Sequence, residues 1–231
     1  PTVLELDGTD AFIVMPSADI EAAAETAIDA RTQNNGQSCI AAKRFFVHAD
    51  VYDQFREKFV EGMKALKVGD PLEDGTNIGP LAMKDIRDDL ASQVEKSIKA
   101  GARPLLEQKA LPDTGWWYGP QILEEAPDNA PAAHEEMFGP VASLWKVSSL
   151  TDAIARANDS PFGLGSSICT TEKGEIEQAI RDLEAGSTFV NSKVASDPRL
   201  PFGGVKTSGY GRELAEDGIR AFINRKTVSI A

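Results

Sequence analysis

Apolar residues recur along the chain at two different spacings, and these spacings predict the order of its elements. A spacing of three or four, as for Val51, Phe55 and Phe59, indicates a helix with one buried face. Gly101 is expected to cap the third helix at its carboxyl end. Helices are predicted at Asp19–Thr32, Ala49–Leu66, Met83–Ala100, Thr151–Ala157, Lys173–Leu183 and Glu213–Ile219.

Short aliphatic and β-branched runs between these helices predict strands. Pro120 interrupts one of them or places it at a sheet edge, because proline cannot donate a ladder hydrogen bond. The repeated alternation of strand and helix predicts an α/β sheet with helices on its faces. Strands are predicted at Thr2–Leu6, Ala11–Met15, Lys43–His48, Pro104–Glu107, Trp117–Ile122, Val141–Val147, Ser166–Thr170, Thr188–Asn191 and Lys226–Ile230.

Composition places the chain among ordinary globular proteins, with 231 residues, 42% hydrophobic and 26% charged. The 24 basic and 36 acidic residues give a net charge of −12, which disfavours nucleic acid or an anionic membrane as the main partner. Without a run of about 18 apolar residues or a basic-then-apolar leader, neither a membrane span nor a secretory signal is expected. Because Pro1 stands first and leads directly into a strand, we expect a fragment of something longer.

Cysteine and histidine usage narrows the chemistry further. Cys39 and Cys169 lie far apart in unlike contexts, so we expect no disulfide framework and favour a reducing cytoplasm. His48 and His134 occur without CxxC or HExxH spacing, so no metal site is expected.

Two residues carry candidate chemistry in the first part of the chain. Cys39 follows the turn NNGQS, where apolar packing is poor, so it is either a thiolate nucleophile or a small side chain that fills space. Glu5 lies within the apolar run LELDG, where an unpaired acid is costly to bury. It is either a carboxylate placed to take a proton from water or a strand residue that faces solvent.

Two further stretches are ambiguous in the same way. In HEEMFGPV, Glu136 and Phe138 either hold a ribose hydroxyl and brace a flat heterocycle or simply end a helix before a Gly-Pro turn. The glycine-rich segment PFGGVKTSGYGRE, residues 201–213, is either a flexible connector or a tight turn where backbone approaches another group.

Taken together, these four stretches resemble the motifs of the aldehyde dehydrogenase superfamily. LELDG corresponds to E-L-G-G, NNGQSC to G-Q-x-C, EEMFGPV to E-E-x-F-G-P-V, and PFGGVKTSGYGRE to P-F-G-G-x-K-x-S-G-x-G-R-E. They occur in the family's order over essentially the whole chain, and ASDPRLPFGGVKTSGYGREL is most similar to the bacterial succinate-semialdehyde dehydrogenase-like branch.

The resemblance implies a fold and an assembly. It implies that residues 1–231 form a three-layer αβα catalytic domain with a mostly parallel sheet. It also implies that the N-terminal domain that binds most of the cofactor lies outside this chain. Residues 224–231 would form a strand through which copies of the chain assemble into a homo-oligomer.

The resemblance also implies site roles. Cys39 would add to an aldehyde, hydride would leave to NAD or NADP, and Glu5 would activate the water that hydrolyses the thioester. Glu136 would bind the nicotinamide ribose with Phe138 beside the ring. The backbone N–H of Cys39 would donate to the oxyanion, and Phe202 would line the substrate entrance.

Departures from the motifs bear on the base and on the substrate. Asp7 replaces a glycine beside Glu5 and is expected to alter the pKa or the position of that base. Some succinate-semialdehyde enzymes hold the substrate carboxylate with an arginine where this chain has Gln33, and Arg199 is a candidate substitute. The aldehyde therefore stays open, with succinate semialdehyde as one candidate.

Three readings of the function follow. The first is the catalytic domain of an NAD(P)-dependent aldehyde dehydrogenase, expected to be unable to oxidise by itself. The second is a catalytically silent domain that assembles through its C-terminal strand. The third is a CoA-acylating dehydrogenase, which needs no general base and is therefore disfavoured by Glu5.

Overall fold

A seven-stranded sheet forms the centre of the computed structural model, which describes residues 1–107 and 111–231. Only the first pair, β4 and β5, is antiparallel, and the remaining neighbours are parallel. The mostly parallel α/β sheet is therefore confirmed. The strand order is β4 (Arg103–Pro104), β5 (Gln121–Glu124), β6 (Val141–Val147), β3 (Arg44–His48), β2 (Ala11–Val14), β8 (Gly165–Cys169) and β9 (Ser187–Val190).

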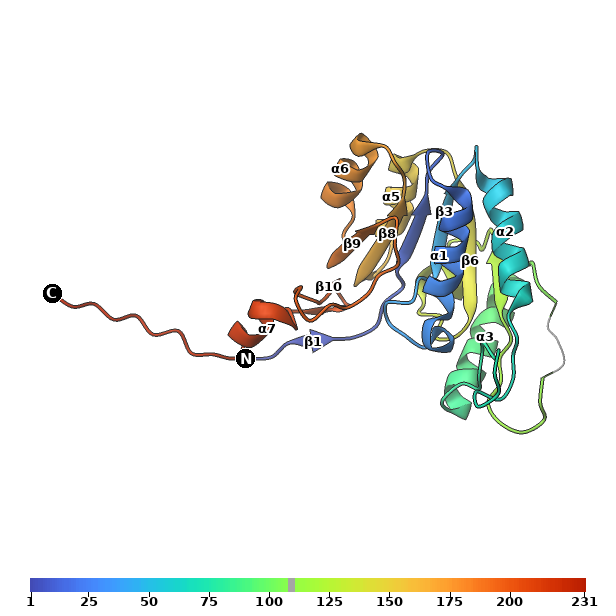
Figure 1. Cartoon of the computed structure of the whole chain (residues 1–231), viewed down its shortest axis with the longest axis horizontal. Helices are drawn as coiled ribbons and strands as arrows, with labels where there is room; N and C mark the ends of the chain where they lie inside the picture. Colours follow the sequence, from blue (N-terminus) through green and yellow to red (C-terminus); the bar gives the residue numbers. More distant parts are fainter. Residues whose placement is uncertain (108–110) are drawn as a thin grey trace.

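Helices cover both faces of this sheet and give three layers (Figure 1). On β2, Phe12 packs with α1 and α2, whereas its neighbour Ile13 packs against the opposite helices. Successive side chains of a strand point to opposite faces, so a strand buried on both faces is apolar throughout. One layer consists of α1 (Ile20–Thr32) and α2 (Tyr52–Ala65), and the other of α3 (Lys84–Ala100), α5 (Leu150–Asn158) and α6 (Lys173–Asp182).

Local signals explain where these helices begin and end. The carboxylate of Asp19 accepts the N–H of Ala22 at 3.1 Å and caps α1. Gly101 ends α3 with a φ of 125°, as expected from the sequence. The strand predicted at Trp117–Ile122 is displaced, because β5 begins only after Pro120.

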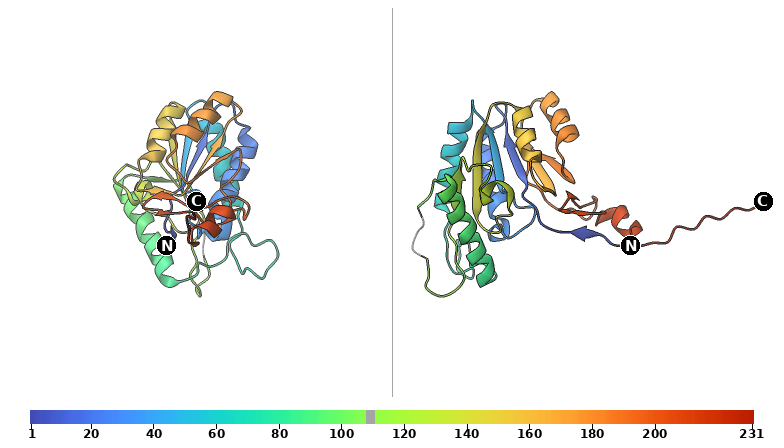
Figure 2. Two further views of the ribbon diagram at one scale, coloured as in Figure 1. Left: turned by 90° about the vertical axis from the view of Figure 1, so that its left-hand side faces the viewer. Right: turned by 180° about the vertical axis from the view of Figure 1, so that it is seen from behind.

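The segments that carry the first and fourth motifs form a smaller unit beside the sheet. β1 (Leu4–Glu5) pairs antiparallel with β11 (Gly209–Tyr210), so the predicted strand Thr2–Leu6 is shorter and lies outside the main sheet. β10 (Val205–Lys206) pairs with β7 (Phe162–Gly163), and α7 (Ala215–Arg220) lies beside the N-terminus (Figures 1 and 2). A short helix, α4 (Pro131–His134), precedes the third motif.

The last residues differ from the sequence-based expectation. Among the described residues, Lys226–Ile230 forms no strand, and this segment extends away from the body of the molecule (Figure 2). Val228 and Ile230 are 69% and 92% exposed. A strand needs a neighbour to pair with, and here the chain offers this segment none. Pairing of residues 224–231 with another copy stays a prediction.

Candidate active site

The turn before Cys39 has an unusual backbone. Asn34, Asn35 and Gly36 have φ values of 50°, 57° and 77°. Asparagine and glycine adopt this left-handed region most readily, which explains the sequence NNG at the end of α1. The side chain of Asn35 accepts the N–H of Gly79 at 3.0 Å and fixes the turn. Gln37, Ser38 and Cys39 follow without regular structure.

An open cleft brings together three of the four motifs. Its described lining comes from LELDG, NNGQSC and EEMFGPV, which lie far apart in the sequence. Four residues singled out from the sequence lie in this cleft, namely Glu5, Cys39, Glu136 and Phe138. The other lining residues are Leu6, Asp7, Gln37 and Ser38.

Three other candidate residues are absent from the described lining of the cleft. Arg199 is exposed and its guanidinium binds the adjacent carboxylate of Asp197. Phe202 is half-buried, and its backbone bonds to that of Glu213. Gln33 lies half-buried in the short 3-10 helix Gln33–Gly36. The substrate-binding roles of these three residues stay predictions.

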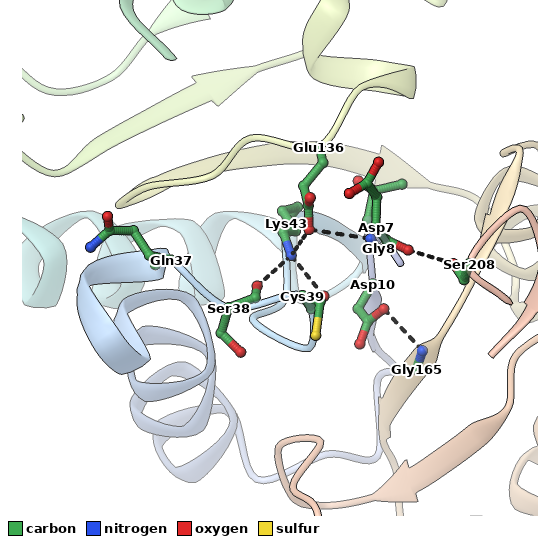
Figure 3. A network of polar contacts seen from close by, with 12 residues as sticks. Asp7, Gly8, Asp10, Gln37, Ser38, Cys39, Lys43, Glu136, Gly165 and Ser208 are labelled. Atoms are coloured by element: carbon green, nitrogen blue, oxygen red, sulfur yellow. Dashed lines mark hydrogen bonds and ion pairs between the residues drawn. The ribbon is translucent and has the colours of Figure 1, made fainter. Parts of the chain in front are cut away.

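Lys43 connects several residues of the cleft through its ammonium group. The sequence motifs alone did not indicate it. Its ammonium donates to the carbonyl oxygens of Ser38 and Cys39 at 2.7 and 2.8 Å and lies 3.2 Å from Oε1 of Glu136 (Figure 3). The same Oε1 accepts the N–H of Gly8 at 3.2 Å. The sequence did contain one signal for Lys43, because this lysine stands directly before the apolar strand that includes FFV. A lysine buried there needs a partner, since lysine is almost never fully buried unless it is paired.

Burial shifts the pKa values of Lys43 and of the charged groups around it. Burial lowers the pKa of Lys43 to about 8 and that of Arg31 to about 9. Burial raises the pKa of Asp10 to about 6, and its Oδ1 accepts the N–H of Gly165 at 2.9 Å (Figure 3). Burial also raises the pKa of the Cys39 thiol, and the charge of Lys43 opposes this rise. Lys43 is thus the main group that favours the thiolate.

The surroundings of Glu5 raise the pKa of its carboxyl group and so make its carboxylate a stronger base than an exposed one. Burial raises the pKa of its carboxyl group, the nearby charge of Glu213 raises it further, and Arg212 opposes both effects. Gly203 lies so close that a β-carbon there would come within 2.7 Å of Oε1 of Glu5. Asp7 has an exposed side chain, and its expected effect on Glu5 stays a prediction.

The cleft has the groups to hold part of a nucleotide. Glu136 is 15% exposed, and its Oε1 is held by Lys43 and Gly8, so its carboxylate is fixed in direction. The ring of Phe138 lines the same cleft. A fixed carboxylate beside an aromatic ring suits a sugar hydroxyl and a flat heterocycle. Among residues 1–107 and 111–231, no group of three or more His, Cys, Asp or Glu side chains is placed to hold a metal ion.

Comparison with known proteins gives concordant matches. Residues 1–228 match the Aldehyde dehydrogenase family. The chain is 54% identical over 230 residues to the succinate-semialdehyde dehydrogenase [NADP(+)] of Mycobacterium avium (strain 104), covering 100% of this chain and 49% of that protein. It is 52% identical over 231 residues to the succinate-semialdehyde dehydrogenase [NADP(+)] 1 of Mycobacterium tuberculosis, covering 50% of that protein.

Solved structures agree with these matches. The succinic semialdehyde dehydrogenase from Streptococcus pyogenes, in complex with NADP+, superposes with a TM-score of 0.95 at 37% identity. That match covers 99% of this chain and 50% of the other. Lactaldehyde dehydrogenase from Escherichia coli gives a TM-score of 0.94 at 33% identity, over 98% and 48% of the two chains. The chain thus spans about half the length of the relatives it matches.

Proposed function

This chain belongs to the aldehyde dehydrogenase family, and on that premise we propose that it is the half of an NAD(P)-dependent aldehyde dehydrogenase that carries the nucleophile and the general base. One observation supports this most directly. Cys39, Glu5, Glu136 and Phe138 come from three distant segments and line one cleft. Those are a thiol, a carboxylate base, a carboxylate for a ribose and an aromatic ring, which are the groups this oxidation uses.

The chemistry assigned to this chain begins at Cys39. Its thiolate adds to the carbonyl carbon of an aldehyde, and the backbone N–H of Cys39 donates to the resulting oxyanion. NAD or NADP, held at its nicotinamide end by Glu136 and Phe138, would supply the hydride acceptor, and loss of hydride from the thiohemiacetal carbon would leave a thioester on Cys39. Glu5 then takes a proton from a water molecule whose oxygen attacks the thioester carbon. The carboxylic acid leaves, and the Cys39 thiolate is restored.

Glu136 and Phe138 are assigned to the nicotinamide end of the cofactor. We assign the rest of the cofactor site to the portion of the relatives that lies outside this chain. The relatives at 52–54% identity are named for NADP(+), which favours NADP over NAD here. An isolated chain of this kind is therefore expected to be unable to oxidise an aldehyde by itself.

Succinate semialdehyde is the substrate that the relatives' names support. Arg199 lies outside the cleft and is already bound to Asp197, so it does not strengthen this assignment. The presence of Glu5 in the cleft supports hydrolysis of the thioester rather than its transfer to CoA. We propose a reducing cytoplasm because Cys39 and Cys169 lie far apart in the sequence and in unlike contexts. Assembly through residues 224–231 is proposed alongside catalysis.

Two reagents test the nucleophile while allowing for the raised pKa of the thiol. Iodoacetamide alkylates a thiolate without forming an oxyanion, whereas p-nitrophenyl acetate acylates it through one. We expect the ratio of acylation to alkylation of Cys39, followed by peptide mapping, to be higher in the folded chain than in urea. Equal ratios in the two states would remove the nucleophile assignment. A Cys39→Ser variant separates catalysis from assembly, because assembly does not need the thiol.

A further inference from the structure

Lys43 touches two successive carbonyl oxygens of the turn that carries Cys39. Its side chain is 1% exposed, and its ammonium lies 2.7 Å from the oxygen of Ser38 and 2.8 Å from that of Cys39. These carbonyls belong to the two peptide groups on either side of Cys39 (Figure 3). Lys43 therefore holds both peptide planes around the nucleophile, and at the Ser38 carbonyl it is joined by the N–H of Ala41, which donates to the same oxygen at 3.1 Å.

Because each peptide group is planar, the contacts with Lys43 also set the direction of two N–H groups. In a trans peptide the C=O and the N–H point in opposite directions. The Ser38 carbonyl faces Lys43, so the N–H of Cys39 faces away from it, and it has no acceptor among the described residues. The Cys39 carbonyl also faces Lys43. The N–H of Ile40 consequently also faces away from Lys43.

We propose that Lys43 is a positioning residue for the reaction at Cys39, because it holds the peptide planes on either side of Cys39 and so aims the N–H of Cys39 at the oxyanion. This inference rests on the proposed function. The same ammonium holds Glu136, so it also sets the nucleophile turn and the ribose-binding carboxylate in one fixed relation.

The cost of burying Lys43 argues for a role beyond stability. Replacing buried ion pairs by apolar side chains of similar volume is often neutral or stabilising, so packing alone does not require a lysine here. Among the described residues, Lys43 has one carboxylate within ion-pair distance, that of Glu136, and it gives its other contacts to the two carbonyls of the turn. Those contacts direct the backbone of the reacting residue.

The test compares acylation and alkylation of Cys39 in the 231-residue chain over a range of pH. Alkylation by iodoacetamide reports the thiolate, and acylation by p-nitrophenyl acetate reports the thiolate together with the oxyanion donor. Lys43→Met has a side chain of similar length without charge or donors. Below about pH 8, where Lys43 carries its charge, we expect alkylation of this variant to be slower, because an opposite charge near the thiolate is lost.

A second change is expected where the thiol is fully ionised. There alkylation of Lys43→Met should reach a limit close to that of the unchanged chain. Acylation should stay slower by about tenfold or more, because removal of one oxyanion donor costs on the order of 100-fold or more. A loss confined to acylation indicates that Lys43 orients the N–H of Cys39, since loosening of the turn alone would slow alkylation as well.

Lys206 offers a matched control. Its ammonium also donates to two carbonyl oxygens, those of Asn158 and Ser160, and also pairs with one glutamate, Glu184. It is absent from the described lining of the cleft. Lys206→Met should leave both the pH profile and the ratio of the two rates unchanged. Lys43→Arg keeps the charge and donors, so we expect the original pH profile and partial recovery of the ratio.

The outcomes separate the possibilities. If Lys43→Met does not fold, as judged by circular dichroism and by exposure of buried Cys169, the neutral and shorter Lys43→Leu, which also lacks donors, carries the same expectation. A folded variant with the original profile and ratio overturns the role of Lys43, and so does an equal loss of both rates. If the unchanged chain shows no higher ratio than in urea, the proposed function itself fails, which is a different result.

Discussion

Gly8 lies against Cys39 so closely that a β-carbon on Gly8 would come within 2.7 Å of the carbonyl oxygen of Cys39. The same carbonyl accepts from Lys43, and the N–H of Gly8 donates to Glu136. Gly8 is thus a point of contact between the first, second and third motifs. The motif needs a glycine there because a β-carbon would meet a backbone atom. A change of side-chain rotamer cannot relieve that contact.

Gly8→Ala should therefore destabilise the chain by about 1–3 kcal/mol, as overpacking of a filled site does. It should also slow acylation of Cys39, because the carbonyl of Cys39 must move away from Lys43. Urea denaturation and p-nitrophenolate release measure the two effects. Gly174→Ala is the control, since a β-carbon there meets nothing within 4 Å and the residue lies in α6. Its stability should stay the same or rise by up to about 1 kcal/mol.

Cys39→Ser should abolish the burst of p-nitrophenolate and the acetylated peptide. The side chain is only half-buried, so we expect stability to change by about 0.5 kcal/mol or less. Cys169 is buried in β8, and burial raises the pKa of its thiol to about 12. Cys169→Ser should keep the burst while losing stability, because it buries a hydroxyl. A burst that survives Cys39→Ser would assign the acylation to another residue.

Glu5→Gln should separate the two halves of ester turnover. The burst should remain, and steady release should fall by about 100-fold or more, because a general base contributes on that scale. Since the base acts when deprotonated and burial raises its pKa above 4.5, steady turnover should increase with pH through that raised value. The variant should lose this dependence. Glu177→Gln, at an exposed site on α6, should behave as the unchanged chain.

Asp10 should make stability depend on pH in weak acid. Burial raises the pKa of its carboxyl group from the ordinary value of 3.8 to about 6. The folded state binds the proton more tightly, so stability should be highest below about pH 4 and fall as pH rises to about 6. The loss attributable to Asp10 should be on the order of 2–3 kcal/mol. Urea midpoints of the unchanged chain and of Asp10→Asn should diverge over this range, and parallel curves would contradict the assignment.

Residues 224–231 should govern self-association. Val228→Asp places a charge in the exposed apolar tail and should shift the sedimentation of the chain towards the monomer. Leu72→Asp is a suitable control, because Leu72 is 92% exposed but lies in a loop distant in sequence from that tail. An unchanged chain that already sediments as a monomer at all concentrations would remove the homo-oligomer from the proposal.

Several features followed from the sequence because their causes are local. The helix predicted at Met83–Ala100 became Lys84–Ala100 with Gly101 as its cap, since helical periodicity and capping act within a few residues. The strand Val141–Val147 was predicted with its observed bounds. Short strands were predicted less well. β1 has only Leu4–Glu5 because its partner is β11, and the partner is chosen by tertiary contacts.

The candidate site shows the same division. The motifs identified Cys39, Glu5, Glu136 and Phe138, because each motif carries its chemistry in adjacent residues. Arg199 was a candidate anchor by position, but a neighbouring aspartate already binds its guanidinium. Asp197 stands only two residues before Arg199, so this competing partner was present in the local sequence, although the sequence alone did not show that the two side chains bind each other.

By itself, the sequence determined the order of elements, the mostly parallel α/β architecture and the candidate side chains of the cleft. The tertiary structure alone decided which of these meet and in which protonation state. Lys43 is the clearest example, because its charge acts on Cys39 and Glu136 only once β3 and the third motif are packed together. Burial and charge interactions depend on distance in space, so they arise only when the chain has folded.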